Sequence, residues 1–490
     1  MPFPRTGSFR LRATVAAFLL AASIARADGG TATTSLPVER MRKAVVAVRA
    51  TQQETDWKNP WKKLSPRTVE FNGIVAEGHT ILVPGSELNA YTLIEVQRLG
   101  EQDWRPAKVK LVDWELPLAL LEVDDPSFWN GLEPLTLASV VPTTGEVQLA
   151  KWESGKFEVA NATVARLESD VFGFGRVRAL ALRLTTTSTS SVHGEAVIAG
   201  GQIVGMVSNS AKDDLTAFAS PFLGDFRREA AHTPYRGFGR LGAYWQTLTN
   251  PSLRESLGLH PEDGGVLVLR VVPEGSAVKG LLPRDIVLEV DGHHVDASGR
   301  FEHPKYGPMR WSLLFTEGKH AGEVVNVLVI RNHSRQTVAV LLRRSSAQDD
   351  RVPQNLVGEK PDYAIEGGLV FQHLSLPYLA TFQGARSAPP LRLAIAASLD
   401  GEWPTPEHPK VVVLTIVLPD PANLGYQELH DLIVERVNGV SVRNLADLRV
   451  AFTKPVGPNH VLEFLAGQGV RRIVLDAAEV EAAAQRVKLD

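Results

Sequence analysis

The sequence predicts a mainly β protein built from several domains. Its 490 residues correspond to about three domains at roughly 150 residues each. Short apolar segments such as Val266–Val271 and Ile286–Val290 are bounded by Gly, Pro and Asp-Gly turns, a pattern typical of strands joined by tight turns. Hydrophobic residues make up 44% of the chain and charged residues 22%, which is the composition of ordinary globular domains with buried cores.

The first expected element is a signal peptide over residues 1–27. Three arginines within residues 5–12 precede an apolar run over residues 13–25, and an Ala-x-Ala site ends at Ala27. These are the parts of a secretory signal peptide. A retained membrane anchor is the alternative, but the apolar run is short for a membrane span. We therefore expect cleavage after Ala27 and a mature protein that is secreted or periplasmic.

Composition excludes several other classes of protein. The chain has no Cys, which excludes disulfides, thiolate metal sites and a lipid-modified N-terminal Cys. The formal net charge of −3 gives no electrostatic case for nucleic acid, and no later run is long enough for an integral membrane segment. His293 and His294 point to opposite sides of a strand, and no further ligand is placed beside them by the sequence. We expect no metal and no other cofactor.

Three segments mark the domain expected over residues 38–226. In chain order they are Gly78–Leu88 (GHTILVPGSEL), Pro117–Leu121 (PLALL) and Ser191–Val197 (SVHGEAV), with Gly201–Met206 (GQIVGM) following the last. Their order and spacing resemble the framework of the HtrA/Deg serine proteases. The resemblance implies a trypsin-like double β-barrel.

The same resemblance implies a degenerate catalytic triad. The family pattern places a His general base in the first segment, an Asp that orients it in the second and a Ser nucleophile in the third. This chain has Ser86, Pro117 and His193 at those positions. A serine nucleophile needs an adjacent base, and the base needs a third group that holds its tautomer. Ser86 and Pro117 can serve neither purpose, so we assign no catalytic residue.

Glu195 adds a second obstacle to catalysis. It replaces the second Gly of the family motif, which places a side chain and a negative charge where an oxyanion would form. A shifted register would use His79 as the base and a hydroxyl group from residues 185–191 as the nucleophile. His79 lies seven residues before Ser86, and moving it into place would reverse the faces of the strand. We expect His79 to lie in a turn.

The next domain is expected over residues 236–346, after a polar, basic linker over residues 227–235. Its motifs, in order, are Gly239–Gly242, Asn250–Arg254, Gly264–Val268, Pro273–Ala277 and Leu282–Gly292. Together they resemble a PDZ domain of the HtrA/Deg kind. Such domains add an extended peptide to a sheet edge beside a helix, and the N–H groups of a Gly-containing loop receive its C-terminal carboxylate.

The resemblance also implies which residues bind the peptide. The helix is expected over residues 308–315. The implied peptide-binding residues are Arg240, Leu241, Gly242, Ala243, Trp311 and Phe315. A purely structural role in the core is the alternative for Leu241 and Trp311.

A connecting segment and a second PDZ-like domain are expected over residues 360–480. Leu432–Val442 parallels Asp285–Val295, with an Asn-Gly turn where the first copy has Asp-Gly. Tyr363–Leu379 resembles the segment that joins two PDZ domains in the plant-type and fungal-type Deg branch. The second copy lacks a clear Gly-Leu-Gly loop and has Tyr426 near the segment that should supply it. We therefore expect a groove that is occluded or used for self-association.

These features favour a proteolytically inactive Deg homologue that binds unfolded or extended polypeptides, or protein C-termini, as a chaperone, adaptor or scaffold in the cell envelope. The alternative is a serine endopeptidase of the same family, active in envelope protein quality control. A third interpretation makes the protease-like domain only an assembly platform for the PDZ domains. The family implies a homo-oligomer based on trimers. The basic, aromatic stretch over residues 57–63 is a candidate oligomer contact, with a solvated loop as the alternative.

Overall fold

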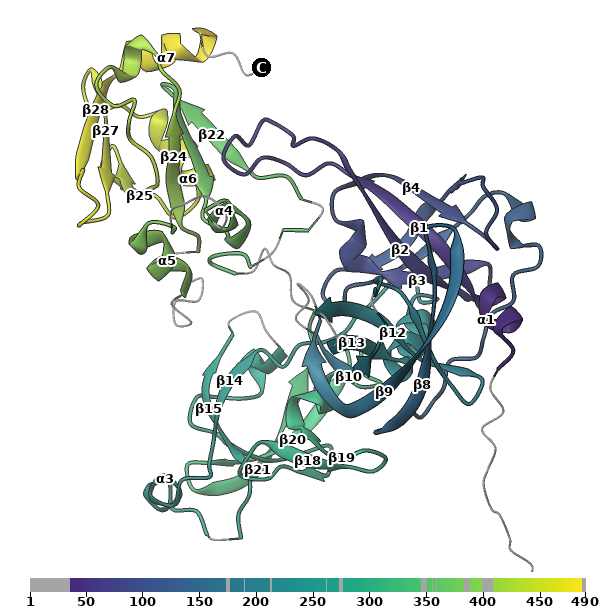
Figure 1. The fold of residues 1–490 in the computed structure, drawn as a ribbon. Coiled ribbons are helices and arrows are strands. Elements are labelled where there is room, and N and C mark those ends of the chain that lie inside the picture. The colour runs from purple at the N-terminus through teal and green to yellow at the C-terminus, as the bar shows by residue number, and fades with distance from the viewer. Residues whose placement is uncertain are drawn as a thin grey trace, which may run out of the picture. The chain divides into compact units, whose positions relative to one another are not determined.

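The protein is mainly β, as the sequence predicts, and Figure 1 shows its succession of sheets. The computed structural model describes residues 36–486 except for residues 173–176, 189, 212–213, 261, 273–275, 345–349, 355, 358, 383–387 and 399–408. The expected signal peptide and its cleavage site lie outside the described residues, as does part of the Pro273–Ala277 motif. No helix of the described part is both long and apolar enough to span a membrane.

The first sheet follows the short helix α1 (Val38–Ala44). Its strands are β1 (Val45–Gln52), β2 (Arg67–Ala76), β3 (Thr80–Pro84), β4 (Tyr91–Gln97), β5 (Arg105–Pro106), β6 (Lys108–Asp113) and β7 (Leu118–Glu122). They pair in the order β5-β4-β1-β2-β3-β7-β6. Val46, Val48 and Ala50 of β1 enter one core because alternate residues of a strand face the same side. The 3-10 turn η1 (Gly85–Leu88) follows β3 directly and carries Ser86.

The second sheet closes into a barrel in the order β10-β13-β12-β11-β8-β9. Its strands are β8 (Gly145–Glu153), β9 (Lys156–Val171), β10 (Arg178–Thr186), β11 (Ala196–Ala199), β12 (Gln202–Ala211) and β13 (Asp214–Ala219), and helix α2 (Ser220–Glu229) follows them. The short turn η2 (Pro126–Trp129) lies in the connection between the two sheets. The loop over residues 187–195 joins β10 to β11 and carries His193, so this loop belongs to the second barrel.

A fully buried amide joins the two barrels. The Nδ2 atom of Asn72 on β2 donates to the carbonyl oxygen of Trp152 on β8 at 3.1 Å, and Trp152 N donates to Asn72 Oδ1 at 2.7 Å. Asn72 N also donates to His193 O at 2.8 Å. Gly194 has φ +82°, and a Cβ atom there would lie 1.9 Å from Asn72 O. The 187–195 loop therefore needs glycine where it crosses β2.

The third sheet belongs to the domain expected over residues 236–346. Its order is β14-β15-β16-β20-β21, with β17 beside β16. The strands are β14 (Ala243–Thr247), β15 (Val266–Val271), β16 (Ile286–Val290), β17 (His293–His294), β20 (Val324–Arg331) and β21 (Ser334–Leu341), and the helical segments are α3 (Pro251–Ser256) and η3 (Ser276–Lys279). In the described sheet β14 is an edge strand. We refer to this domain as the first PDZ-like domain.

The helix expected over residues 308–315 is wrong in its first half. The hairpin of β18 (Arg300–His303) and β19 (Gly307–Arg310) takes residues 307–310, and only the 3-10 turn η4 (Trp311–Phe315) follows. Gly307 has φ +72°, which suits the hairpin turn and not a helix. Pairing with β18 then holds the residues after Gly307 extended.

The last sheet has the order β22-β23-β24-β25-β27-β28, with β26 beside β25. Its strands are β22 (Tyr363–Glu366), β23 (Leu369–His373), β24 (Val412–Val417), β25 (Leu432–Val437), β26 (Val440–Ser441), β27 (Asn459–Phe464) and β28 (Arg472–Asp476). The helices are α4 (Leu376–Ala380), α5 (Leu391–Ser398), α6 (Leu445–Phe452) and α7 (Ala477–Arg486), with the turn η6 (Pro421–Asn423). We refer to this part as the C-terminal domain.

Two sets of contacts involve the protease-like barrels and the domains that follow. The Tyr235 hydroxyl of the linker donates to the fully buried Asp113 of β6 at 2.6 Å, and Arg344 approaches the same carboxylate at 3.4 Å. Trp57 packs against an apolar cluster of the C-terminal domain, and its carbonyl oxygen accepts from Gln372 Nε2 at 3.1 Å. The stretch over residues 57–63 thus makes a contact within its own chain, which the sequence analysis did not anticipate.

Candidate functional site

Two of the three residues that the resemblance places at triad positions, Ser86 and His193, contact the same glutamate. His193 Nδ1 is 2.6 Å from Glu87 Oε1, and the Ser86 hydroxyl donates to the same oxygen at 3.3 Å. The ring comes from the second barrel and the carboxylate from the first, so the pair spans the cleft between the barrels. Sequence reasoning missed Glu87. The signal that could have identified Glu87 is its place in the sequence, directly after Ser86, together with a His in the segment that the resemblance places opposite.

Pro117 takes no part in this polar group. Its carbonyl oxygen accepts from Gly85 N at 2.7 Å, so the residue fixes the backbone beside η1. A proline side chain offers no donor or acceptor. Pro117 therefore contributes a backbone acceptor and no polar side-chain group at this place.

The charge of His193 follows from its partner. The hydrogen bond to Glu87 raises the pKa of His193, which burial opposes and the charges of Glu87 and Glu195 reinforce. The side chains of His193 and Glu87 keep 33% and 17% of their surface exposed, so solvent screens the pair in part. The carboxylate 2.6 Å away therefore favours the charged form of the imidazole.

Glu195 turns back onto its own loop. It is 1% exposed, and its Oε1 atom accepts from Val192 N at 2.5 Å. Burial raises the pKa of Glu195, against the hydrogen bond from Val192 and the charge of Lys151. Gly194 N donates to Val207 O at 2.8 Å and Glu195 N to Val192 O at 3.4 Å. Three N–H groups of residues 192–195 therefore already have acceptors within the protein.

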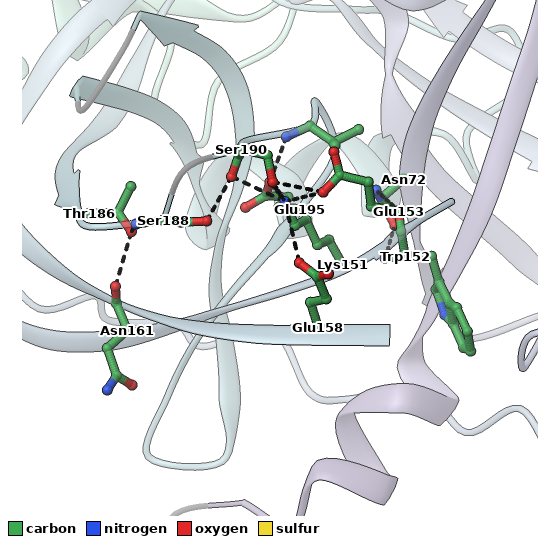
Figure 2. Close-up of polar contacts among 11 residues, drawn as sticks. Asn72, Lys151, Trp152, Glu153, Glu158, Asn161, Thr186, Ser188, Ser190 and Glu195 are labelled. Carbon is green, nitrogen blue, oxygen red and sulfur yellow. Dashed lines mark hydrogen bonds and ion pairs between the residues drawn. The ribbon is translucent and has the colours of Figure 1, made fainter. Parts of the chain in front are cut away.

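A buried lysine holds the same loop from below, as Figure 2 shows. The Lys151 side chain is 3% exposed, and its Nζ atom lies 2.7 Å from Glu153 Oε2, 2.6 Å from Ser190 Oγ and 3.9 Å from Glu195 Oε1. The Ser190 hydroxyl donates to Glu153 Oε2 at 2.7 Å. These hydrogen bonds lower the pKa of Glu153. The ammonium group thus binds the 187–195 loop to β8.

His79 lies where the sequence analysis expects it. It occupies the turn between β2 and β3 with φ +53°. Its ring stacks on Trp129 with centroids 5.0 Å apart. The ring is thereby held in the first barrel by an aromatic contact.

The implied peptide-binding residues of the first PDZ-like domain divide into two groups. The loop of residues 240–243 leads directly into the edge strand β14, and Gly242 O accepts from Val272 N at 2.8 Å. Trp311 and Phe315 are fully buried, and Trp245 of β14 packs edge-on against Trp311 with centroids 5.8 Å apart. The loop is therefore placed at a sheet edge, whereas the two aromatic residues lie beneath Trp245 in the core.

The C-terminal domain has a similar loop before its strand β23, and an additional strand, β22, pairs with β23. Leu418 N donates to Gly368 O at 2.7 Å, which matches the bond from Val272 to Gly242, so the loop before β23 is the equivalent loop. The sequence analysis expected this loop near Tyr426, and that expectation was wrong. The Tyr426 hydroxyl accepts from Val474 N on β28, the strand at the opposite edge of the sheet. The strand β22 pairs with β23 from Tyr363↔Gln372 onward. The edge of β23 is therefore occupied by the chain itself, as expected for an occluded groove.

Comparison with known proteins agrees with these domains. A family profile described as a PDZ domain matches residues 352–488. Protease Do-like 2, chloroplastic, from Arabidopsis thaliana is 28% identical over 421 residues, covering 83% of this chain and 67% of that protein. Putative protease Do-like 11, mitochondrial, from the same organism is 27% identical over 412 residues, with the same shares covered. The sequence of this chain is therefore similar to HtrA/Deg-family proteases over most of its length.

The fold of the HtrA/Deg homologue is also found among solved structures. A variant of the HtrA-type protease AlgW, solved with a decapeptide, aligns with a TM-score of 0.50 at 18% identity, covering 63% of this chain and 96% of that one. At this identity the likeness concerns the fold alone. The candidate site is therefore interpreted from the residues of this chain.

Proposed function

We propose that this HtrA/Deg homologue is proteolytically inactive and binds extended polypeptides or protein C-termini as a chaperone, adaptor or scaffold of the cell envelope. The observation that carries the proposal is the ion pair of His193 with Glu87, 2.6 Å apart, at the position of a nucleophile. Neither a base nor a free nucleophile is formed by Ser86, Pro117 and His193. The name of the AlgW structure, a protease with a decapeptide, supports peptide binding as the retained activity.

The alternative, a serine endopeptidase with a different constellation, has one observation in its favour. Ser190 Oγ lies 2.6 Å from Lys151 Nζ, and a Ser-Lys pair is a known variant of the triad. Such a pair needs a neutral amine that can accept the serine proton. Here the Ser190 hydroxyl itself donates to Glu153 Oε2 at 2.7 Å. Its proton is directed at that carboxylate and not at the amine, so the contact favours a structural lock on the loop.

The edge of β14 is the peptide-binding site in this proposal. An extended segment that pairs with β14 would place its terminal carboxylate at the loop of residues 240–243, where backbone N–H groups serve as donors. The corresponding edge of the C-terminal domain is already paired with β22. We therefore expect only the first PDZ-like domain to bind peptide. Trp245 of β14 would present its ring to the ligand.

The wider setting of the protein is also part of the proposal. HtrA proteins form homo-oligomers based on trimers, and we propose the same assembly for this chain. The relatives are chloroplastic and mitochondrial by name, whereas the N-terminal sequence favours a secreted or periplasmic protein. Secretion into the periplasm therefore needs a direct test by fractionation of cells that produce the full chain.

One experiment tests the proposal directly. Purified protein is treated with a fluorophosphonate label and with unfolded casein, beside the Ser190→Ala and Ser191→Ala variants, and suppression of client aggregation is followed on the same samples. We expect no label, no cleavage and suppressed aggregation in all three proteins. Cleavage that disappears in either variant would overturn the proposal and identify the nucleophile.

A further inference from the structure

One buried histidine of the first PDZ-like domain faces helix α2. His320 lies between η4 and β20 and is 7% exposed. It forms an isolated bridge with Phe238, and Ala321 N donates to Gly237 O at 3.0 Å. The rings of His320 and Phe238 have their centroids 5.2 Å apart. Backbone and aromatic contacts within its own domain therefore hold the ring in place.

The polar edge of this ring meets two carboxylates of α2. His320 Nε2 lies 3.5 Å from Asp225 Oδ1 and 3.6 Å from Glu229 Oε2. The side chains of Asp225 and Glu229 keep only 10% and 1% of their surface exposed. His320 Nδ1 is buried and has no hydrogen-bond partner among the described residues. The polar link between the ring and α2 is therefore made through Nε2.

The neighbouring charges leave this contact short of positive charge. Arg236 Nη2 lies 2.7 Å from Glu229 Oε2, and Arg236 Nη1 lies 3.2 Å from Oε1 of Glu323, the residue before β20. Arg228 Nη2 is 3.3 Å from Asp225 Oδ1, but the arginine side chain is 70% exposed, so solvent screens its charge. In the part of the chain that the structure describes, three carboxylates therefore share two guanidinium groups at this contact.

A protonated His320 supplies the missing positive charge. Burial lowers the pKa of His320, but the hydrogen bond to Asp225 and the charges of Asp225 and Glu229 outweigh burial, so the pKa is raised although the charge of Arg236 opposes this. A ring released into water has the ordinary pKa of about 6.5. The contact is therefore fully stabilised below about pH 6.5, and this stabilisation is lost as the pH rises through the raised pKa.

The apolar part of the same contact does not titrate. Phe222 of α2 and Phe238 are fully buried, and their ring centroids lie 6.1 Å apart. We propose that His320 forms a pH-sensitive joint between α2 and the first PDZ-like domain, closed while its ring is protonated and loosened when the ring is neutral. Phe238 lies two residues before the loop of residues 240–243, so the joint is next to the start of that loop. The inference does not depend on the proposed function.

Hydrogen exchange of one amide reports the opening of the joint. Arg236 N donates to Glu229 Oε1 at 3.1 Å, so loosening the joint exposes this amide to exchange. Its protection factor, corrected for the intrinsic pH dependence of exchange, is measured in the full chain between pH 6 and pH 9. We expect the factor to fall roughly 3- to 5-fold as the pH rises, the size expected for one ion pair. The Val268 amide, bonded to Asp285 O at 2.8 Å in the same domain, is the internal reference. Constant protection of Arg236, or an equal fall at Val268, would overturn the proposal.

Two histidine variants identify the titrating group. His320→Gln removes the charge and keeps a side chain that can donate to Asp225. Its Arg236 protection should equal the high-pH value of the parent at every pH, and a fall like that of the parent would refute the joint. His232→Gln is the matched control, because the His232 side chain is 60% exposed and lies 3.8 Å from Oε2 of the same Glu229. It should show the fall of the parent, and loss of the fall in this variant would rule out His320 as the titrating group.

A carboxylate variant keeps the proposal testable should His320→Gln fail to fold. Asp225→Asn removes one of the two negative charges that raise the pKa of His320, so the fall in protection should move to lower pH. NMR of the histidine-labelled full chain gives a second readout, since one ring should titrate above about pH 6.5 in the parent and at a lower pH in Asp225→Asn. An unmoved fall, or no ring that behaves in this way, would overturn the proposal.

Discussion

Replacing the buried Lys151 tests whether its ammonium group holds the 187–195 loop in place. In Lys151→Met the ammonium that lies 2.7 Å from Glu153 and 3.9 Å from Glu195 is lost. Breaking a buried ion pair costs about 3–5 kcal/mol. Glu153 remains 33% exposed and can be solvated, and Glu195 can take up a proton because burial already raises its pKa. We therefore expect a loss of about 2–3 kcal/mol, just below that range.

The assay follows the protease-like domain by thermal unfolding and the loop by hydrogen exchange. A loss of this size lowers the Tm of a domain of this length by about 5–10 °C and speeds exchange of the Val192 and Gly194 amides. Lys156→Met, at an exposed position on the same hairpin, is the matched control and should change neither. The double variant Lys151→Met/Glu153→Gln should recover part of the loss because the uncompensated charge is gone. If Lys151→Met unfolds and exchanges like the parent, the buried ammonium does not hold the loop.

Three further predictions concern the cleft and the linker. Folding raises the pKa of His193. Its pairing with Glu87 therefore adds about 1 kcal/mol to the free energy of unfolding below about pH 6.5, and this stability is lost as the pH rises through the raised pKa. His193→Gln should remove this pH dependence from urea unfolding measured between pH 6 and 9, and an unchanged pH dependence would refute the ion pair. Gly194→Ala should lower the free energy of unfolding by at least about 3 kcal/mol because its Cβ would meet Asn72 O. In the control Gly200→Ala the space around the Cβ is open, so only backbone strain of about 1–2 kcal/mol is expected. Similar losses in the two variants would contradict the close approach. Tyr235→Phe should lower stability by about 1–2 kcal/mol, because it removes a donor from the buried Asp113, and a neutral result in the same unfolding assay would contradict that role.

The strands and their connections were predictable because they depend on local patterns. The apolar segment Val266–Val271 and the Asp-Gly turn after β16 are visible within a few residues of sequence. The hairpin β18–β19 was not predicted, since the pattern of apolar residues from Pro308 to Phe315 also fits a helix and only pairing with residues 300–303 decides between them. The sequence supplied the turn residue Gly307 but not its partner strand.

Only part of the candidate site was predictable. The family framework around Ser86 and His193 singled these residues out, and the structure brings both to one glutamate. Glu87 and Lys151 belong to no such framework, and their importance depends on side chains that meet across 106 and 39 residues of sequence. The Gly367–Gly368 loop was missed because its identity depends on the matching bond from Leu418 N. Burial of Trp311 likewise depends on Trp245, which sequence spacing does not bring beside it.

The side-chain amide of Asn72 makes the hydrogen bonds that a backbone amide makes in a strand pair. Its amide offers one donor and one acceptor to Trp152 at 3.1 and 2.7 Å, the same exchange that two paired strand residues make. The outer edge of β8 is thus completed at that point by an amide from the other barrel. Neither a carboxylate nor an apolar group of the same shape can make both bonds. One side-chain amide therefore gives the first sheet a strand-like pairing with β8 at Trp152.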